Sequence, residues 1–157
     1  PAHVRDKDGI ATSVVAASLV AALKAQGRSV WDELERLARL HGLHVSSPLT
    51  FRVEEIDQIA SGMARLRAQP PSVLAGSPVV EVSDLSQGYR GLPPTDGVLV
   101  LTEAGDRVIA RPSGTEPKLK CYLEVILPVA EGEPLPWEQA RERLDAIKGA
   151  FAEIIGL

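Results

Sequence analysis

The chain of 157 residues contains a single cysteine, Cys121, so no disulfide can form within it. Aromatic residues make up only 4% of the sequence, and the apolar fraction of 45% must therefore fill a core mainly with Ala, Val and Leu. The net charge of −4 gives no reason to expect nucleic acid or an anionic membrane as a partner. We expect Cys121 to be a small buried hydrophobe, and a cytoplasmic location is compatible with its reduced state.

Long hydrophobic runs are also scarce. The one membrane-like run, residues 10–23, is too short to span a bilayer, and we expect no signal peptide. His41 and His44 have no carboxylate or cysteine at ligand spacing, so we predict no metal site in this chain. Because the chain starts with Pro1 and its only methionine is Met63, we expect it to be part of a longer protein.

The stretch 111–118, Arg-Pro-Ser-Gly-Thr-Glu-Pro-Lys, lies between two predicted strands. The runs 97–101 and 106–110 before it are apolar and rich in β-branched residues. Residues 118–125 after it alternate between polar and apolar, which is typical of a strand with one buried face. The pattern therefore predicts a tight loop between antiparallel strands.

The side chains of this loop suit a phosphate group. Arg111 has a planar fork of donors, Ser113 and Thr115 have hydroxyl groups, and Lys118 adds an ammonium group. Gly114 lets backbone N–H groups approach a ligand closely, and successive N–H groups in such a turn can form an anion-binding concavity. The alternative is an ordinary β-turn in which proline and glycine serve only the backbone.

Residues 44–157 are predicted to have an α+β fold. We expect the order β-α-β-β-β-α, with an antiparallel sheet covered on one face by two helices. Pro48 limits the first strand to an edge of the sheet. Tyr89 and Arg90 lie in a long loop, 85–96, where they either approach a ligand or pack on the surface. The last helix is predicted to begin near Pro136 and to reach residue 155.

The string 111–118, entered and left by strands, resembles the phosphate-binding loop in the C-terminal domain of the α-D-phosphohexomutases. This superfamily includes phosphomannomutase and phosphoglucomutase. The resemblance implies a four-domain isomerase that moves a phosphoryl group within a sugar through a phosphoserine and a sugar bisphosphate. It also implies a magnesium ion in the second domain, a third domain that reads the sugar hydroxyls, and a fourth domain that clamps the phosphate that is not reacting.

By this resemblance, the loop residues receive individual roles. Arg111 is the main charge partner of the phosphate, Ser113 and Thr115 donate hydroxyl hydrogens, and Lys118 adds a point charge. The backbone N–H of Gly114 is a further donor. Lys120 shares the polar face of the strand with Lys118 and either joins the site or is structural. Glu116 and Pro117 are expected to shape the loop.

The first part of the chain resembles the end of the third domain in the same superfamily. The resemblance rests on Asp-Lys-Asp-Gly-Ile at 6–10, the Ala-rich helix 9–26, and a second helix capped by Ser29. It implies that residues 1–43 are the remnant of an α/β domain and that 44–157 are the fourth domain. The helix 9–26 is apolar around nearly its whole circumference. We therefore expect the isolated chain to self-associate through it, to swap it, or to fold it onto the last domain.

The catalytic motifs of the superfamily are missing from these residues. We find no Ser-His phosphoserine motif, no Asp-x-Asp-x-Asp metal loop and no acidic sugar-reading loop. We therefore predict that the chain alone is inactive and contributes no catalytic residue, and the sequence does not identify the sugar. Two alternatives are a stand-alone phosphate- or nucleotide-binding module without catalysis and a structural or oligomerisation fragment.

Overall fold

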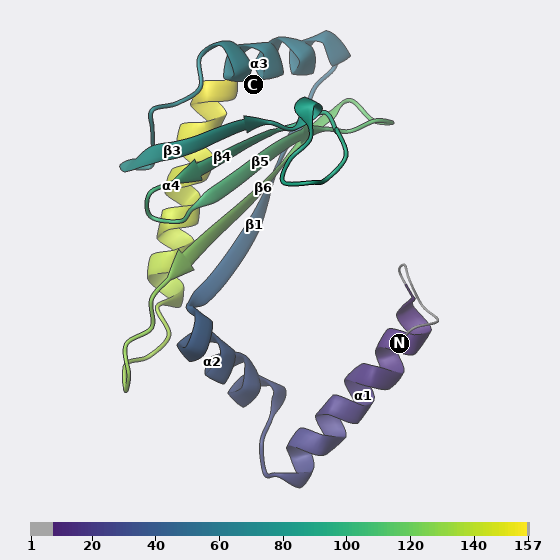
Figure 1. The fold of residues 1–157 in the computed structure, drawn as a ribbon, viewed down its shortest axis with the longest axis vertical. Coiled ribbons are helices and arrows are strands. Elements are labelled where there is room, and N and C mark those ends of the chain that lie inside the picture. Colours follow the sequence, from purple (N-terminus) through teal and green to yellow (C-terminus); the bar gives the residue numbers. More distant parts are fainter. Residues whose placement is uncertain (1–7, 157) are drawn as a thin grey trace.

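Six strands form one antiparallel sheet in the order β1-β6-β5-β4-β3-β2 in the computed structural model, which describes residues 8–156 (Figure 1). The elements in chain order are α1 (Gly9–Ala25), α2 (Val30–His41), β1 (Leu43–Arg52), α3 (Ile56–Ala68), β2 (Val73–Leu74), β3 (Ser77–Asp84), η1 (Leu85–Gln87), β4 (Val98–Thr102), β5 (Arg107–Pro112), β6 (Lys118–Leu127) and α4 (Trp137–Ile155). The α+β class predicted from the sequence is confirmed.

The predicted order is short by two strands. It has four strands, whereas the structure has six. The runs 97–101, 106–110 and 118–125 all form strands, of which the order omits one, and residues 73–74 add a short strand. The segment around β2 has no strand pattern, because its prolines and glycine are typical of turns. β1 lies at an edge of the sheet, as Pro48 predicts, and it pairs with β6 from Leu43 to Arg52.

One face of the sheet carries the core. The apolar residues of β6 alternate with polar ones, and those that are buried are Leu119, Cys121, Leu123, Val125 and Leu127. The inner residues of α4 belong to the same core: Ala140, Leu144, Ile147, Phe151 and Ile155. α4 contacts β6 and β1, and α3 contacts α4, β4 and β6. The opposite face of the sheet, which we call the outer face, holds an apolar row of Leu99, Ile109 and Tyr122. Its charged side chains include those near the loop that joins β5 to β6.

Cys121 is 1% exposed within this core. Burial raises the pKa of its thiol to about 12, because the charged thiolate would lose its hydration. The expectation of a buried hydrophobic cysteine is confirmed.

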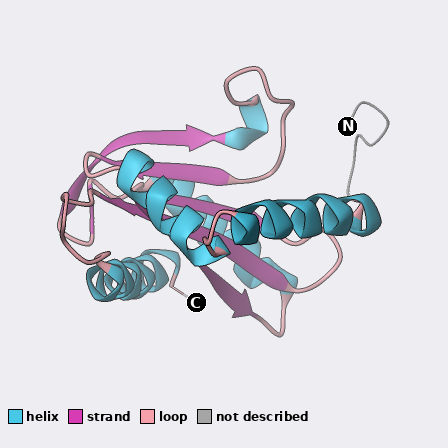
Figure 2. Cartoon of the chain, turned by 90° about the horizontal axis from the view of Figure 1, so that it is seen from below, coloured by secondary structure: helices cyan, strands magenta, loops and turns pink. Residues whose placement is uncertain are grey.

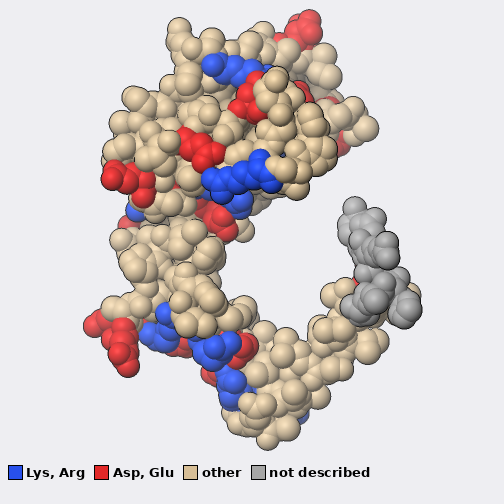
Figure 3. Space-filling view, in the orientation of Figure 1, with Lys and Arg blue, Asp and Glu red and all other residues tan. Residues whose placement is uncertain are grey.

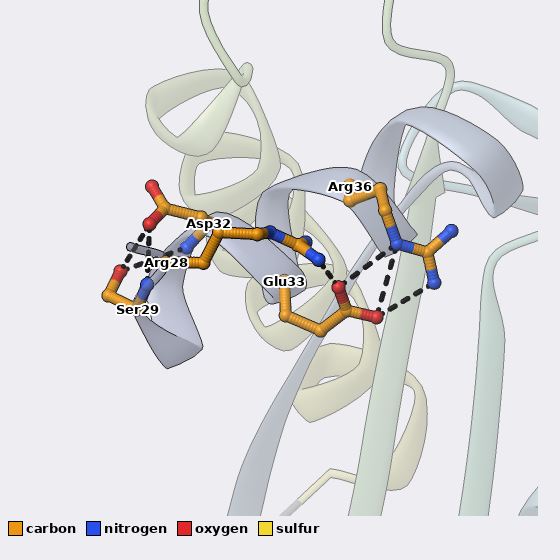
Figure 4. A network of polar contacts seen from close by, with 5 residues as sticks. All are labelled: Arg28, Ser29, Asp32, Glu33 and Arg36. Carbon is orange, nitrogen blue, oxygen red and sulfur yellow. Dashed lines mark hydrogen bonds and ion pairs between the residues drawn. The ribbon is translucent and has the colours of Figure 1, made fainter. Parts of the chain in front are cut away.

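The two N-terminal helices begin at side-chain caps. Asp8 accepts hydrogen bonds from the backbone N–H groups of residues 10 and 11 at 2.9 and 3.0 Å. α1 ends before Gly27, whose φ of 69° is in the left-handed region. The first turn of α2 is a capping box between Ser29 and Asp32 (Figure 4). From the sequence, Asp6 is an alternative cap for this helix, and it lies outside the described residues.

The same turn of α2 holds a small ion-pair network. Glu33 accepts hydrogen bonds from the guanidinium groups of Arg36 and Arg28 (Figure 4). These bonds, with Arg36 the larger cause, lower the pKa of Glu33 from 4.5 to about 2. They favour the start of α2 without reaching the sheet.

α1 extends away from the sheet (Figure 1), and the view from below has α1 and α2 in front of the strands (Figure 2). Leu23 is its one buried residue among those described, and Ile10 is 83% exposed. Figure 3 shows a helix surface with almost no charged side chains. Self-association through this helix stays a prediction, as does the domain boundary at 43/44.

Within the described residues, no single helix is long and apolar enough to cross a membrane. α1 and α2 are long and apolar enough only when they are taken together, and they are bent by 91° relative to each other.

Candidate phosphate site

The loop between β5 and β6 closes an antiparallel hairpin. Pro112 pairs with Leu119 in the register of the two strands. The N–H of Ser113 donates to the carbonyl oxygen of Lys118 at 2.8 Å, and the N–H of Lys118 donates to that of Glu116 at 2.7 Å. The loop lies where the strand pattern predicts it, at one end of the sheet (Figure 1).

Arg111 is the penultimate residue of β5, and its side chain is on the outer face of the sheet. It is exposed, and among residues 8–156 its guanidinium forms no hydrogen bond or ion pair with another side chain. An unpaired guanidinium keeps all of its donors available for an anion. Arg111 is therefore free of competing side-chain partners within these residues.

The tip of the loop is open. Ser113 is partly buried, whereas Gly114 and Thr115 are exposed. Gly114 does not have a positive φ, and a Cβ atom added to it would meet nothing within 4 Å. Neither the backbone conformation nor packing within the chain requires a glycine at this position. A glycine at this position still leaves the neighbouring backbone N–H groups accessible to a ligand, because it has no side chain to cover them.

Lys118, by contrast, has a partner in the loop. Its ammonium group lies 2.6 Å from the carboxylate of Glu116, and its side chain is only 16% exposed. The pKa of Glu116 is lowered mainly by this hydrogen bond and charge, and also by the charges of Lys120 and Arg52. The carboxylate therefore lies in the field of three cations.

The sheet register explains this concentration of charge. Arg52, the last residue of β1, pairs with Lys118, the first residue of β6. In the next row of the outer face, Lys120 lies between Thr50 on β1 and Arg111 on β5. Four cations thus occupy two neighbouring rows beside the loop. Sequence reasoning included Lys120 as an open case but missed Arg52, since only the pairing of β1 with β6 brings it here.

The loop 85–96 lies at the same end of the sheet (Figure 1). Gly97, at its end, has no room for a side chain, because an added Cβ would lie 3.1 Å from the carbonyl oxygen of Ala110 and 3.2 Å from Leu85. The Cβ of Arg111 would lie 3.9 Å from a Cβ added to Gly97, so the two residues are neighbours. The missed signal was a glycine directly before a strand, which often marks a close approach of two backbones.

Tyr89 and Arg90 contact each other rather than the phosphate loop. The guanidinium carbon of Arg90 lies 4.9 Å from the centre of the Tyr89 ring, and Arg90 forms an ion pair of 3.1 Å with Glu81. These contacts favour surface packing over ligand binding as the role of Tyr89 and Arg90.

The other end of β5 is held by a buried ion pair. Asp106 is 0% exposed, and its Oδ2 accepts two hydrogen bonds from the guanidinium of Arg143 on α4, at 2.9 and 2.8 Å. The hydroxyl of Thr102 also donates to Oδ2, at 3.3 Å. This contact joins α4 to the turn from which β5 leads to Arg111.

A groove of about 1040 Å³ lies between α2, β1 and the start of α4, and Trp31, Leu34, Leu43 and Trp137 are among its lining residues. It is mostly apolar and far from the loop in the sheet. Residues 8–156 contain no group of three or more His, Cys, Asp or Glu placed to hold a metal ion. The resemblance assigns its magnesium ion to the second domain, and that assignment stays an expectation.

The fold and the loop define an α+β domain with a cationic hairpin loop at one end of its sheet. Residues 50–133 match the family described as phosphoglucomutase/phosphomannomutase, C-terminal domain. The chain therefore belongs to the phosphoglucomutase/phosphomannomutase family and contains its C-terminal domain. The family resemblance found in the sequence is confirmed.

Individual relatives give the same result. The chain is 40% identical over 124 residues to a probable phosphomannomutase of Haemophilus influenzae, covering 79% of this chain and 25% of that protein. It is 33% identical over 136 residues to a phosphoglucomutase of Staphylococcus haemolyticus, covering 78% of this chain and 25% of that protein. A phosphopentomutase of Pongo abelii is 26% identical over 166 residues, with coverages of 96% and 27%.

A solved structure also resembles the fold. The open form of pp63/parafusin, a phosphoglucomutase from Paramecium, has a TM-score of 0.61 and 17% identity, covering 99% of this chain and 29% of that one. At this identity the likeness concerns the fold. The chain spans about a quarter of the length of the curated relatives it matches.

Proposed function

We propose that this chain is the C-terminal part of a phosphohexomutase that interconverts sugar 1-phosphates and 6-phosphates. In this proposal, the reaction passes through a phosphoserine and a sugar bisphosphate, and the loop 113–117 with Arg111 clamps the phosphate that is not reacting. Membership of the family and the geometry of the loop support it. The observation that carries the clamp is the exposed guanidinium of Arg111, which has no ion-pair partner among residues 8–156. Gly114, in the same loop, has nothing within 4 Å of an added Cβ.

The proposed role follows from the chemistry of phosphoryl transfer. Such reactions depend on positioning and on neutralising charge more than on covalent chemistry by the protein. A sugar with a phosphate at each end must be held in two opposite orientations, and the phosphate is what both orientations share. Arg111, Ser113, Thr115, Lys118 and the N–H of Gly114 would supply donors to that common group.

The remaining parts of the proposal concern the intact protein. The phosphoserine, the magnesium ion and the sugar-reading loop are assigned to domains outside this chain, and we propose a cytoplasmic location. The related proteins are named for glucose, mannose and pentose, so the substrate class is left as a phosphorylated sugar. The isolated chain should show no mutase turnover, and a measurable rate from these 157 residues would overturn that statement.

The clamp is tested by titrating the chain with inorganic phosphate and comparing it with Arg111→Ala. Hydrogen bonds to charged groups contribute about 1.5–3 kcal/mol, so we expect a roughly 10-fold to 150-fold loss of affinity. Arg107→Ala is the matched control, because Arg107 lies on the same strand and face but pairs with Glu124 at 2.7 Å. Equal affinities for the parental chain and Arg111→Ala would reject the clamp.

A further inference from the structure

The outer face of the sheet beside the loop carries two pairs of like positive charges. Arg52 is directly opposite Lys118, and Lys120 is directly opposite Arg111. Side chains opposite each other in a sheet have Cβ atoms about 4.5–5.5 Å apart, and like charges in such pairs are destabilising. Two like-charge pairs in neighbouring rows indicate that an anion belongs between them.

Within residues 8–156, the carboxylate of Glu116 is the one that forms an ion pair with this cationic group. Glu116 lies 2.6 Å from the ammonium of Lys118, and Lys120 and Arg52 are close enough to lower its pKa further. The loop is tied to the end of β1, since the N–H of Val53 donates to the carbonyl oxygen of Pro117 at 3.1 Å. Arg52, Lys120 and Arg111 have no ion-pair partner among the same residues. The single carboxylate of Glu116 thus lies in the field of Lys118, Lys120 and Arg52, and Arg111 adds a fourth positive charge opposite Lys120.

We propose that Arg52 and Lys120 complete the phosphate site, and that Glu116 occupies its cationic side until a phosphate dianion displaces it. The proposal rests on the proposed function, that is, on phosphate binding by the loop. It adds a residue from β1 that lies outside the 111–118 string, and it gives Glu116 a role as an internal competitor.

The physical reason is the balance of charge. A phosphate dianion brings two negative charges and several acceptor oxygens into the two rows, whereas the carboxylate brings one charge. Glu116 can leave at little cost, because its side chain is 48% exposed and can turn to water. Its departure frees the ammonium of Lys118 for the ligand. The carboxylate lowers the net affinity, because phosphate must first break its ion pair with Lys118.

The experiment is a titration of the 157-residue chain with inorganic phosphate at constant ionic strength and about pH 7.5, followed through the backbone amide NMR signals of residues 113–116 and 118. The variants are Arg52→Met, Lys120→Met and Glu116→Gln, with Arg107→Met as the control on the same face. Exposed charges contribute a fraction of a kcal/mol to about 1 kcal/mol each, so we expect Arg52→Met and Lys120→Met to weaken binding about threefold to fivefold. Glu116→Gln should tighten it by a similar factor, and Arg107→Met should leave it unchanged.

The double variant Arg52→Met/Glu116→Gln separates two roles of Arg52. If Arg52 contacts the phosphate, its loss weakens binding in the Glu116→Gln background as much as in the parental chain. If it acts only by holding the carboxylate, its loss has no effect once the charge at position 116 is gone, and the proposal is overturned for Arg52. An unchanged affinity of Glu116→Gln overturns the displacement.

Arg111→Ala in the same series keeps the two proposals apart. If Arg111→Ala loses affinity while Arg52→Met and Lys120→Met do not, the clamp stands and the enlarged site is wrong. If Arg111→Ala binds as well as the parental chain, the clamp itself is wrong. If neither the parental chain nor Glu116→Gln shows any shift of the loop signals, both proposals are wrong.

Discussion

Replacing Arg143 by methionine is expected to destabilise the domain strongly, because it removes the cation that accompanies a fully buried carboxylate. Arg143 donates both hydrogen bonds that reach Asp106 from α4, at 2.9 and 2.8 Å. After the change, Oδ2 would keep only the hydroxyl of Thr102, and Oδ1 already has no partner among the described residues. The perturbation therefore leaves a charge in the core with a single neutral donor.

The size of the effect follows from burial. Removing one member of a buried ion pair costs about 3–5 kcal/mol, and we expect the lower end because the Arg143 side chain is 27% exposed. With a urea m-value of about 2 kcal/mol/M, a loss of about 3 kcal/mol lowers the unfolding midpoint by about 1.5 M. The double variant Asp106→Leu/Arg143→Met removes the buried charge as well and should recover most of this loss.

The assay is urea unfolding followed by circular dichroism. Arg141→Met is the control, since it makes the same substitution two positions earlier at an exposed residue of α4 and should change stability by less than about 0.5 kcal/mol. If Arg143→Met costs no more than Arg141→Met, the ion pair does not hold β5 against α4. If the double variant is as unstable as the single one, the loss comes from packing rather than from the unpaired carboxylate.

Three further outcomes are expected. Gly114→Ala should change the free energy of unfolding by less than about 0.5 kcal/mol, since nothing lies within 4 Å of an added Cβ, yet weaken phosphate binding in the NMR titration; unchanged binding would contradict the access argument. The carboxyl signal of Glu33 should titrate near pH 2, so its contribution to stability is present above about pH 4.5 and is lost as the pH falls towards 2. Arg36→Met should raise the titration midpoint of Glu33. A midpoint near 4.5 in the parental chain would refute the network. The parental chain should self-associate in light scattering through the apolar surface of α1, and Val14→Lys/Leu19→Lys should make it monomeric; a monomeric parental chain would exclude the association.

Local signals predicted much of the fold. The caps at Asp8 and Ser29 and the glycine at 27 predict the ends of the first helices, because each acts within one turn of the backbone. The alternation after residue 118 predicts which side of β6 is buried. Pro48 predicts an edge strand, since proline has no N–H to donate, and in a central strand that would leave a gap in the hydrogen bonding. The short strand β2 was missed, because two residues carry no periodicity.

The candidate site was predicted in part. The residues of the loop were found from their chemistry, and the structure brings Arg111, Lys118 and Lys120 to one end of the outer face. Arg52 was not found, because nothing near it in sequence says which residue of β6 it will oppose. The ion pair between Lys118 and Glu116 was not found either, since the same spacing is compatible with a carboxylate that points to water.

The sequence by itself determined the class of the fold, the family and the group of side chains that suits a phosphate. The family rests on the resemblance of the string 111–118 to a known loop. The fold class and the group of side chains depend on composition, on periodicity and on residues a few positions apart. The tertiary structure alone decided that β1 pairs with β6 in a register that sets Arg52 against Lys118, and that Asp106 meets Arg143. The physical reason is that register is chosen by how whole faces pack against α3 and α4, and a shift of one residue would turn every outer side chain inward.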